Sequence, residues 1–251
     1  MLWADHQLSD VGPTWDPSYV PSSFLSALLP RRRKQARVLV DVLADLGIEG
    51  PVLDYGCGQG VFLTVLLEGG IDVFGCDPDP EIPNSEVPKD RLLPQDAPWN
   101  VPPGSWGAVV FLDVLEHSDQ PVEVLKNLDT RHVILKVPNA RGPAALMARV
   151  LNRLGQPGLL DRLFLVGENF PHIWIATDRG LSTIAKRAGW SISQRIGFAE
   201  VGKELPDRMR SGVEVRGVRR FFISVVGLFL ALVGPVWSDT KVVVLSRNGS
   251  N

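Results

Sequence analysis

The sequence predicts an α/β protein whose core is a doubly wound, mostly parallel sheet. From residue 35 onward, strand-like apolar runs alternate with helical patterns, which is typical of parallel strands joined by crossover helices. A glycine-rich loop stands where the first predicted strand meets the next helix, and acidic side chains follow several later strands. Since such sheets bind ligands beyond the carboxyl ends of their strands, we expect the functional site at that edge.

The first half of the chain shows the alternation most clearly. A leading helix is predicted over Gln35–Leu46, where apolar residues recur at helical spacing and Gly47 provides a stop. The elements that follow are a strand over Pro51–Tyr55, a helix over Val61–Leu67, a strand over Asp72–Cys76, a weak strand near Arg91–Leu93 and a strand over Ala108–Leu112. Prolines 80, 83 and 88 leave little room for a helix after the second strand, because proline lacks an N–H group.

The second half continues the alternation after one interruption. A helix over Val122–Leu128 and a strand over His132–Val137 lead to residues 140–175, where scattered Arg, Gly and Pro break the rhythm. We interpret this stretch as a lid inserted over the site. Beyond it the sequence predicts a helix over Asp178–Ala188, then strands over Trp190–Phe198 and Lys241–Ser246.

Length and composition fit one domain, since 251 residues with 45% hydrophobic content suffice for a sizeable core. We expect residues 1–30 to form an irregular arm that contributes to the site, and residues 31–251 to form the domain. The arm lacks the layout of a signal peptide. A formal net charge of -2 gives no global reason to expect a nucleic-acid partner, and the run Arg31–Lys34 is interpreted as the solvated start of a helix.

The two cysteines, Cys57 and Cys76, lie at predicted strand ends and lack a metal-ligand spacing. We therefore expect reduced thiols, a cytoplasmic protein and no metal site.

The glycine loop is the most informative feature of the sequence. Glycine has no Cβ and tolerates positive φ, so Gly56, Gly58 and Gly60 let the main chain turn sharply and approach a ligand closely. The spacing differs from the dinucleotide fingerprint G-x-G-x-x-G, because the third glycine comes one residue early and Val61 stands in its place. Asp54 precedes the loop, and a carboxylate beside a helix start suits a cation better than a phosphate.

Acidic residues follow the later strands at positions suited to a nucleoside. Asp77 could accept two hydrogen bonds from vicinal ribose hydroxyls, or it could simply begin a turn with Pro78. Asp96 and Ala97 could meet the polar edge of an adenine through a side-chain acceptor and a backbone N–H, although Asp96 also suits an ordinary loop. The fourth strand runs into the sequence Leu112-Asp113-Val114-Leu115-Glu116-His117.

Together these pieces, with Val137-Pro138-Asn139 and Ala188-Gly189-Trp190, resemble the class I S-adenosylmethionine-dependent methyltransferases. The branch that they resemble is that of the ubiquinone-biosynthesis O-methyltransferases, and the match covers about Arg37 to Trp190. The resemblance implies a seven-stranded, Rossmann-like sheet with an antiparallel last strand, and methyl transfer from S-adenosylmethionine. The residues that it assigns to the cofactor are Asp54, Tyr55, Gly56, Cys57, Gly58, Gly60, Asp77, Pro78, Asp96, Ala97, Leu112 and Asp113.

Catalysis of methyl transfer places modest demands on side chains, because the sulfonium methyl group is already activated and the enzyme mainly holds the acceptor in line. An acceptor hydroxyl must still lose a proton, and the candidates to take it are His172, His117 and Asp113. We hypothesise that His172 is the base because it lies in the predicted lid. A packing or hydrogen-bonding role is the alternative for His172, and His117 is interpreted as a residue that ties down its loop.

Residues 205–237 are predicted to form an arginine-rich and then an apolar helical segment. Phe221–Trp237 carries no charge and is just long enough to span a bilayer, but a crossing would separate the last strand from its sheet. The segment is interpreted as core packing, with contact to an anionic membrane surface or a lipid-linked acceptor as the alternative.

The sequence thus predicts O-methylation of a small-molecule, sugar or lipid-precursor acceptor. Two alternatives remain open, a non-catalytic module that binds S-adenosylmethionine and a nicotinamide-dependent oxidoreductase. Oligomeric state is not predicted.

Overall fold

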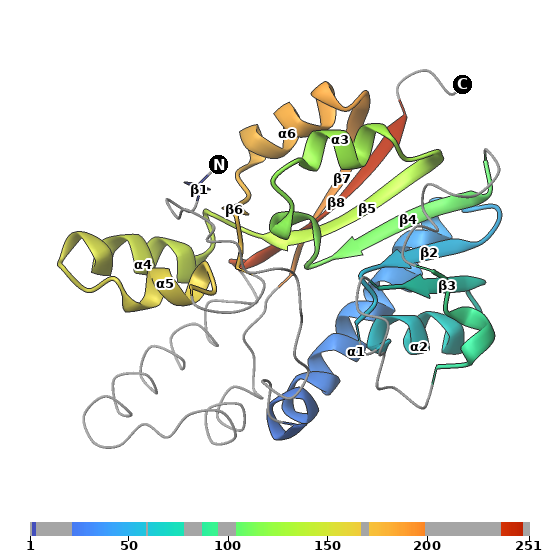
Figure 1. Cartoon of the computed structure of the whole chain (residues 1–251), viewed down its shortest axis with the longest axis horizontal. Coiled ribbons are helices and arrows are strands. Elements are labelled where there is room, and N and C mark those ends of the chain that lie inside the picture. Colours follow the sequence, from blue (N-terminus) through green and yellow to red (C-terminus); the bar gives the residue numbers. More distant parts are fainter. Residues whose placement is uncertain are drawn as a thin grey trace.

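A computed structural model describes residues 2–3, 22–58, 60–77, 87–94, 104–166, 171–198 and 237–247. Its centre is a sheet in the order β3-β2-β4-β5-β8-β7, with helices on both faces (Figure 1). The strands are β2 (Val52–Tyr55), β3 (Val73–Cys76), β4 (Trp106–Leu112), β5 (Thr130–Pro138), β7 (Trp190–Phe198) and β8 (Thr240–Arg247). The predicted doubly wound α/β fold is confirmed.

The direction of the strands follows the prediction. β2 pairs in parallel with β3 and β4, and β4 pairs in parallel with β5. β8 lies between β5 and β7 and is antiparallel to both, so the last strand is reversed as expected.

The weak strand predicted near Arg91–Leu93 is reduced to one contact. Lys89–Arg91 forms the short 3-10 helix η2, after which Leu92 makes a single parallel bridge with Gly75. Since prolines 88 and 94 flank this stretch and cannot donate to a ladder, few residues are left to pair. The described part of the sheet therefore has six strands, and the position expected for the seventh is marked only by this bridge.

Two helices cover one face of the sheet. They are α1 (Ser22–Asp45) and α2 (Val61–Glu68), and their apolar sides pack on residues such as Val52, Ala108 and Val244. The prediction that the leading helix begins at Gln35 was wrong, because α1 starts at Ser22 and continues through Pro30. Pro30 is exposed, so the backbone carbonyl that loses its partner can be hydrated.

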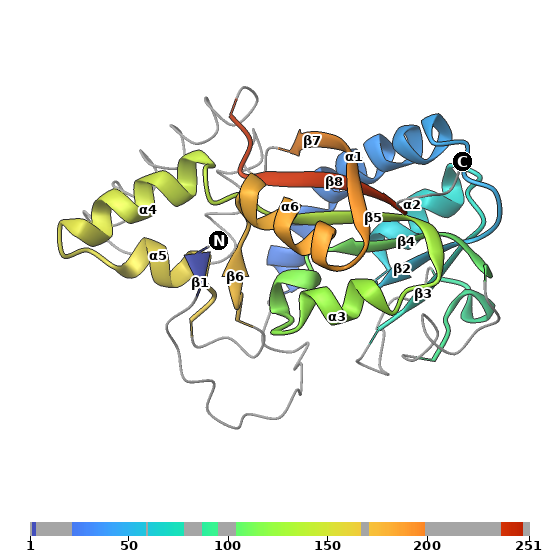
Figure 2. The same cartoon turned by 90° about the horizontal axis from the view of Figure 1, so that it is seen from above.

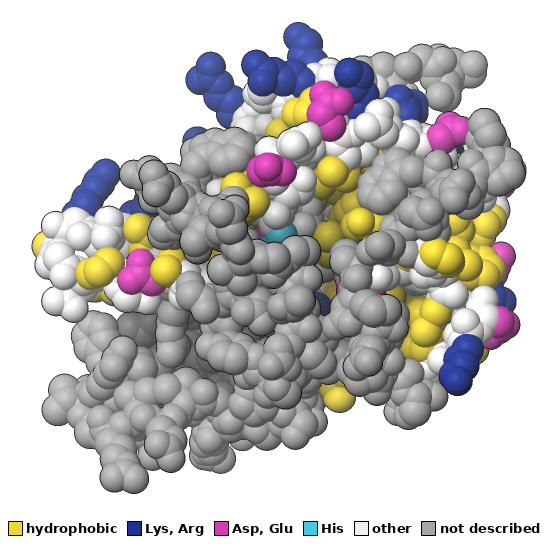
Figure 3. Space-filling view, viewed as in Figure 1, with side chains coloured by type: hydrophobic (Ala, Val, Ile, Leu, Met, Phe, Trp, Pro, Cys, Tyr) yellow, Lys and Arg dark blue, Asp and Glu magenta, His cyan; other side chains and the backbone are white. Residues whose placement is uncertain are grey.

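The opposite face carries α3 (Pro121–Lys126) and α6 (Asp178–Arg187), while η3 (Leu115–His117) forms a short 3-10 turn between β4 and α3. Thr177 caps α6, since its Oγ1 accepts a hydrogen bond from Gly180 N–H at 3.1 Å. The inner side of α6 buries Leu181 and Ile184, and its outer side exposes basic residues such as Arg187. Lys and Arg side chains accordingly gather where α6 lies at the top of Figure 3.

The predicted lid forms a separate group of elements at one end of the sheet (Figure 2). Its described part contains α4 (Pro143–Arg153), α5 (Gly158–Leu163) and β6 (Trp174–Ile175). β6 pairs antiparallel with β1 (Leu2–Trp3), so the start of the chain adjoins the end of the lid. Residues 22–30 of the predicted arm belong to α1, so this part is helical and not irregular, and most of the remaining arm lies outside the described residues.

The apolar and arginine-rich segment falls almost wholly outside the described residues, which resume at Trp237. Among the described helices, none combines the length and the apolar character that a membrane span requires. Cys57 and Cys76 are both buried and do not form a disulfide with each other.

Candidate functional site

The glycine loop joins β2 to α2 with the backbone conformation that the sequence predicts. Gly56, Gly58 and Gly60 all have positive φ, at 74°, 52° and 71°. A Cβ on Gly56 would lie 2.5 Å from Val114 Cγ2, whereas a Cβ on Gly58 would meet no atom of the described chain within 4 Å. Gly56 is thus required for packing against the loop after β4, and Gly58 leaves the backbone open to a ligand.

Asp54, the third residue of β2, is the most unusual group beside this loop. Its side chain is 1% exposed, and neither carboxylate oxygen has a hydrogen-bond partner within the described residues. Burial and then the negative charge of Asp77 raise its pKa to about 7, against the opposing effect of the positive charge of Arg32. A buried acceptor without a donor indicates a group that completes the site.

Asp77, directly after β3, contacts the loop itself. Its Oδ2 accepts a hydrogen bond from Gly58 N–H at 2.7 Å, so the carboxylate predicted to bind ribose lies beside the glycine loop. Pro78, Asp96 and Ala97 lie outside the described residues, and their predicted contacts with the cofactor stay predictions.

The remaining residues assigned to the cofactor line the same strand ends. Tyr55 is half-buried against Phe111, with ring centroids 5.3 Å apart, and burial raises its pKa to about 12. Burial also raises the pKa of the Cys57 thiol, which makes it a packing residue and not a nucleophile. Leu112, the last residue of β4, is buried.

Asp113 follows β4 and has a φ of 60°, which is unusual for a residue other than glycine. Its two carboxylate oxygens accept hydrogen bonds from Lys136 Nζ at 2.8 and 2.6 Å, and Arg32 Nη1 lies 3.6 Å from Oδ2. Lys136, the third residue from the carboxyl end of β5, is 1% exposed. Asp113 is therefore held in a partly buried ion pair, and its proposed role as a base remains a prediction.

Lys136 was not recognised as part of the site from the sequence. A lysine inside the apolar run from Val133 to Val137 is the signal that points to it, because a buried ammonium requires an anionic partner.

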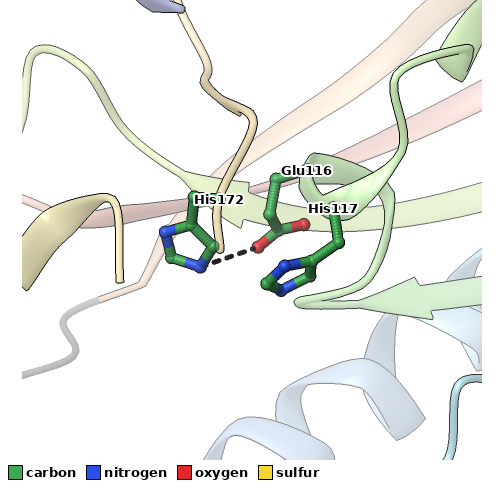
Figure 4. A group of neighbouring side chains, drawn as sticks. All are labelled: Glu116, His117 and His172. Carbon is green, nitrogen blue, oxygen red and sulfur yellow. Dashed lines mark ion pairs between the residues drawn. The ribbon is translucent and has the colours of Figure 1, made fainter. Parts of the chain in front are cut away.

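His117 and His172 come together although 54 residues separate them (Figure 4). Their ring centroids are 4.9 Å apart, and His172 Nε2 lies 3.9 Å from Glu116 Oε1. Glu116 is 0% exposed and His172 is 17% exposed. Burial and then the neighbouring His117 lower the pKa of His172 to about 4, so its ring is neutral at pH 7.

The lid is fixed to the loop after β4 by several hydrogen bonds. Ile173 N–H donates to Glu116 O at 2.9 Å, and Trp174 Nε1–H donates to Ser118 O at 3.0 Å. The predicted placement of His172 beside the carboxyl edge of the sheet is consistent with these contacts. Glu116 was quoted in the sequence motif but was not assigned a role, and its complete burial is visible only in the structure.

The two halves of the site are adjacent because Gly56 packs on Val114, two residues before Glu116. One half combines the open glycine loop with two carboxylates, and the other combines two imidazoles with a third carboxylate. The first half suits a positively charged nucleoside, since a cation satisfies Asp54 and hydroxyl groups can bind Asp77.

Solved structures of methyltransferases share this fold. A SAM-dependent methyltransferase from Archaeoglobus fulgidus aligns over 90% of this chain and 100% of its own, with 16% identity and a TM-score of 0.54. The protein bound to the Trm112 methyltransferase activator in a Haloferax volcanii complex aligns over 90% of this chain and 96% of its own, with 15% identity and a TM-score of 0.57. No curated protein matches the chain significantly.

The family follows from a match that covers more than half of the chain. The methyltransferase domain family matches residues 21–194, which include the glycine loop, Asp77, the loop after β4 and the lid. This agrees with the prediction that S-adenosylmethionine is the cofactor, and the buried Asp54 carboxylate, which has no hydrogen-bond partner in the described part of the chain, fits a positively charged ligand. The chain belongs to the methyltransferase domain family and has the class I fold of S-adenosylmethionine-dependent enzymes.

Proposed function

We propose that this protein transfers the methyl group of S-adenosylmethionine to an oxygen atom of a small-molecule, sugar or lipid-precursor acceptor. The observation that carries the cofactor half is the buried Asp54 carboxylate, which has no hydrogen-bond donor within the described residues and lies beside an open glycine loop. The resemblance to ubiquinone-biosynthesis O-methyltransferases supports oxygen as the acceptor atom.

The cofactor half would be held by residues at the ends of β2 and β3. Asp54 would balance the positive charge of the ligand, and Asp77 would accept hydrogen bonds from the ribose hydroxyls. Gly58 N–H already binds Asp77, so the loop and the ribose-binding carboxylate would be positioned as one unit. When bound, S-adenosylmethionine supplies a methyl group that its sulfonium centre has activated.

The acceptor half would be formed by the loop after β4 and the lid. His172 is neutral at pH 7 and its Nε2 lies toward Glu116, so an acceptor proton that reaches Nε2 would give an imidazolium beside a carboxylate. The hydrogen bonds between the lid and this loop would keep the lid in place, and the lid would in turn orient the acceptor and exclude water.

Calorimetry tests the cofactor assignment. We expect heat on titration with S-adenosylmethionine and with S-adenosylhomocysteine, and none with NAD. Asp54→Asn should weaken S-adenosylmethionine binding by at least 10-fold, whereas Asp161→Asn, the same change at an exposed position on α5, should not alter it. Binding of NAD without binding of either sulfur ligand would contradict the proposal.

A panel of acceptors tests the transfer itself. Release of S-adenosylhomocysteine with phenolic, sugar or isoprenoid-linked hydroxyl compounds would identify the acceptor class. Tight binding without transfer to any of these compounds would instead favour the non-catalytic binding module.

A further inference from the structure

The Glu116, His117 and His172 side chains form a cluster with the composition of a metal site. One ligand atom from each of the three residues lies within 4.8 Å of the others. Metal-bound nitrogen and oxygen atoms lie about 2.0–2.2 Å from a zinc-like ion, so ligand atoms at this separation need only small side-chain rotations to share one ion.

We propose that Glu116, His117 and His172 bind a divalent transition-metal ion at the acceptor half of the site. Metal binding itself is independent of the proposed methyl transfer, whereas the catalytic role given to the metal below rests on that function.

The hydrogen bonds of the two histidines are the first support for this proposal. His117 Nδ1 lies 3.0 Å from Pro171 O, and His172 Nδ1 lies 2.6 Å from Leu163 O. A carbonyl oxygen can only accept, so Nδ1 must carry the proton in both rings, and Nε2 is the nitrogen with a lone pair for coordination. Metal-binding histidines commonly donate their other N–H to a backbone carbonyl in this way, which fixes both tautomer and orientation.

The position of Glu116 is the second support. Its side chain is 0% exposed, and its Oε1 lies 3.9 Å from His172 Nε2 (Figure 4). A carboxylate oxygen at this distance from an imidazole nitrogen can share one metal ion with it, and carboxylates and imidazoles are common ligands of the same ion.

The backbone holds the three ligands in a fixed relation. Glu116 and His117 belong to the 3-10 turn η3, and His172 belongs to the lid. Ile173 N–H donates to Glu116 O at 2.9 Å, and His172 N–H donates to Phe164 O at 3.0 Å. The first bond attaches the lid to the turn that carries the other two ligands, and the second holds His172 within the lid, as a preorganised site requires.

The donor set indicates the class of metal. Two imidazoles and one carboxylate suit zinc, iron or cobalt better than magnesium or calcium, which prefer oxygen ligands throughout. Three protein ligands also leave coordination positions open, as in catalytic sites. The sequence analysis predicted no metal site because the two cysteines lack a metal-ligand spacing. The sequence does not show that residue 172 lies beside residues 116 and 117.

An open position on the metal would serve the acceptor. A hydroxyl oxygen that binds there becomes more acidic, because the cation stabilises the negative charge that deprotonation leaves. The O–H bond breaks and its proton passes to water, because His172 Nε2 would bind the metal in this arrangement and the cation would replace that nitrogen as the group that activates the hydroxyl. An oxygen electron pair then forms the new O–C bond while the S–C electron pair stays on sulfur, so the sulfonium becomes a neutral thioether and no oxidant is needed.

Metal titration of the purified full chain tests the site. After treatment with EDTA and its removal, Co²⁺ should bind at one equivalent per chain, with visible absorption bands, and Zn²⁺ should displace it. Glu116→Gln and His172→Ala should each weaken Co²⁺ binding by at least 100-fold. His132→Ala, a histidine on β5 outside the cluster, should bind Co²⁺ like the wild type.

Binding of S-adenosylhomocysteine, measured in the same variants, separates this proposal from the proposed function. It should change by less than about 2-fold, since these residues are outside the cofactor half, and it also reports folding. If Glu116→Gln does not fold, Co²⁺ binding is measured in His172→Ala and His172→Gln instead, because His172 is partly exposed and its replacement disturbs the core less. Wild-type protein that binds the sulfur ligand but no Co²⁺, or cluster variants that bind Co²⁺ like the wild type, would overturn the metal site. Co²⁺ binding without any sulfur ligand binding would retain the metal site and reject the proposed function.

Discussion

Replacing Asp54 with Asn should remove a pH dependence of stability that this one carboxyl group creates. Burial raises its pKa from 3.8 to about 7, so the folded protein binds the proton more tightly than the unfolded chain does. The stabilisation from this proton is complete below pH about 4 and is lost as the pH rises through about 7. The full difference corresponds to about 4 kcal/mol, of which about 2.5 kcal/mol falls between pH 5 and pH 8.

Urea unfolding at several pH values between 5 and 8 measures this effect. The free energy of unfolding of the wild type should fall over this interval by about 2.5 kcal/mol more than that of Asp54→Asn. Asp161→Asn, an exposed control on α5, should keep the wild-type slope. Equal slopes for wild type and Asp54→Asn would refute the raised pKa.

The same group should couple cofactor binding to pH. A positively charged ligand beside Asp54 favours its ionised form, so binding near pH 6 should release up to one proton and affinity should increase from pH 6 to pH 8. Calorimetry in two buffers with different ionisation enthalpies measures the proton, and Asp54→Asn should abolish its release. Proton uptake in place of release would show that the ligand does not approach this carboxylate with a positive charge.

Three further substitutions test other parts of the site. Gly56→Ala should destabilise the protein by about 2 kcal/mol more than Gly155→Ala, since both glycines have a similar positive φ but only Gly56 has a side chain within 3 Å of its added Cβ; equal unfolding free energies would contradict this. Asp113→Asn should cost about 3 kcal/mol because it removes the carboxylate that accepts both hydrogen bonds from the buried Lys136 ammonium, and a loss below about 1 kcal/mol in denaturant unfolding would count against the ion pair. Thr177→Ala should cost about 1 kcal/mol by removing the N-cap of α6, with Thr177→Ser retaining most of the stability.

The sheet could be predicted from the sequence because each strand is a short apolar run with clear boundaries. The ends of β2, β3 and β7 agree with the prediction within one residue. The start of α1 could not be predicted, since its first turns contain Pro30 and four basic residues that read as a boundary.

The site was predictable only where it is local. The glycine loop, Asp54 and Asp77 belong to one stretch whose spacing indicates its chemistry. The roles of Glu116, His172 and Lys136 depend on contacts between segments that are far apart in the sequence. The spacing of apolar residues does not indicate that the lid contacts the loop after β4. The adjacency of His117 and His172 therefore required the structure.

The pairing of β7 with β8 makes the sheet tolerant of change at one particular place. Phe198, the last residue of β7, pairs with Thr240, the first residue of β8, and Thr240 also pairs with Pro138 at the carboxyl end of β5. The last residue of β7 and the first residue of β8 are therefore direct neighbours in the sheet, and Asn139 holds the approach to β8 through hydrogen bonds to Ser238 O and Asp239 O. Because both attachments are paired residues beside the carboxyl end of β5, a change in the length of the connecting segment need not alter the register of β7 against β8 or of β8 against β5.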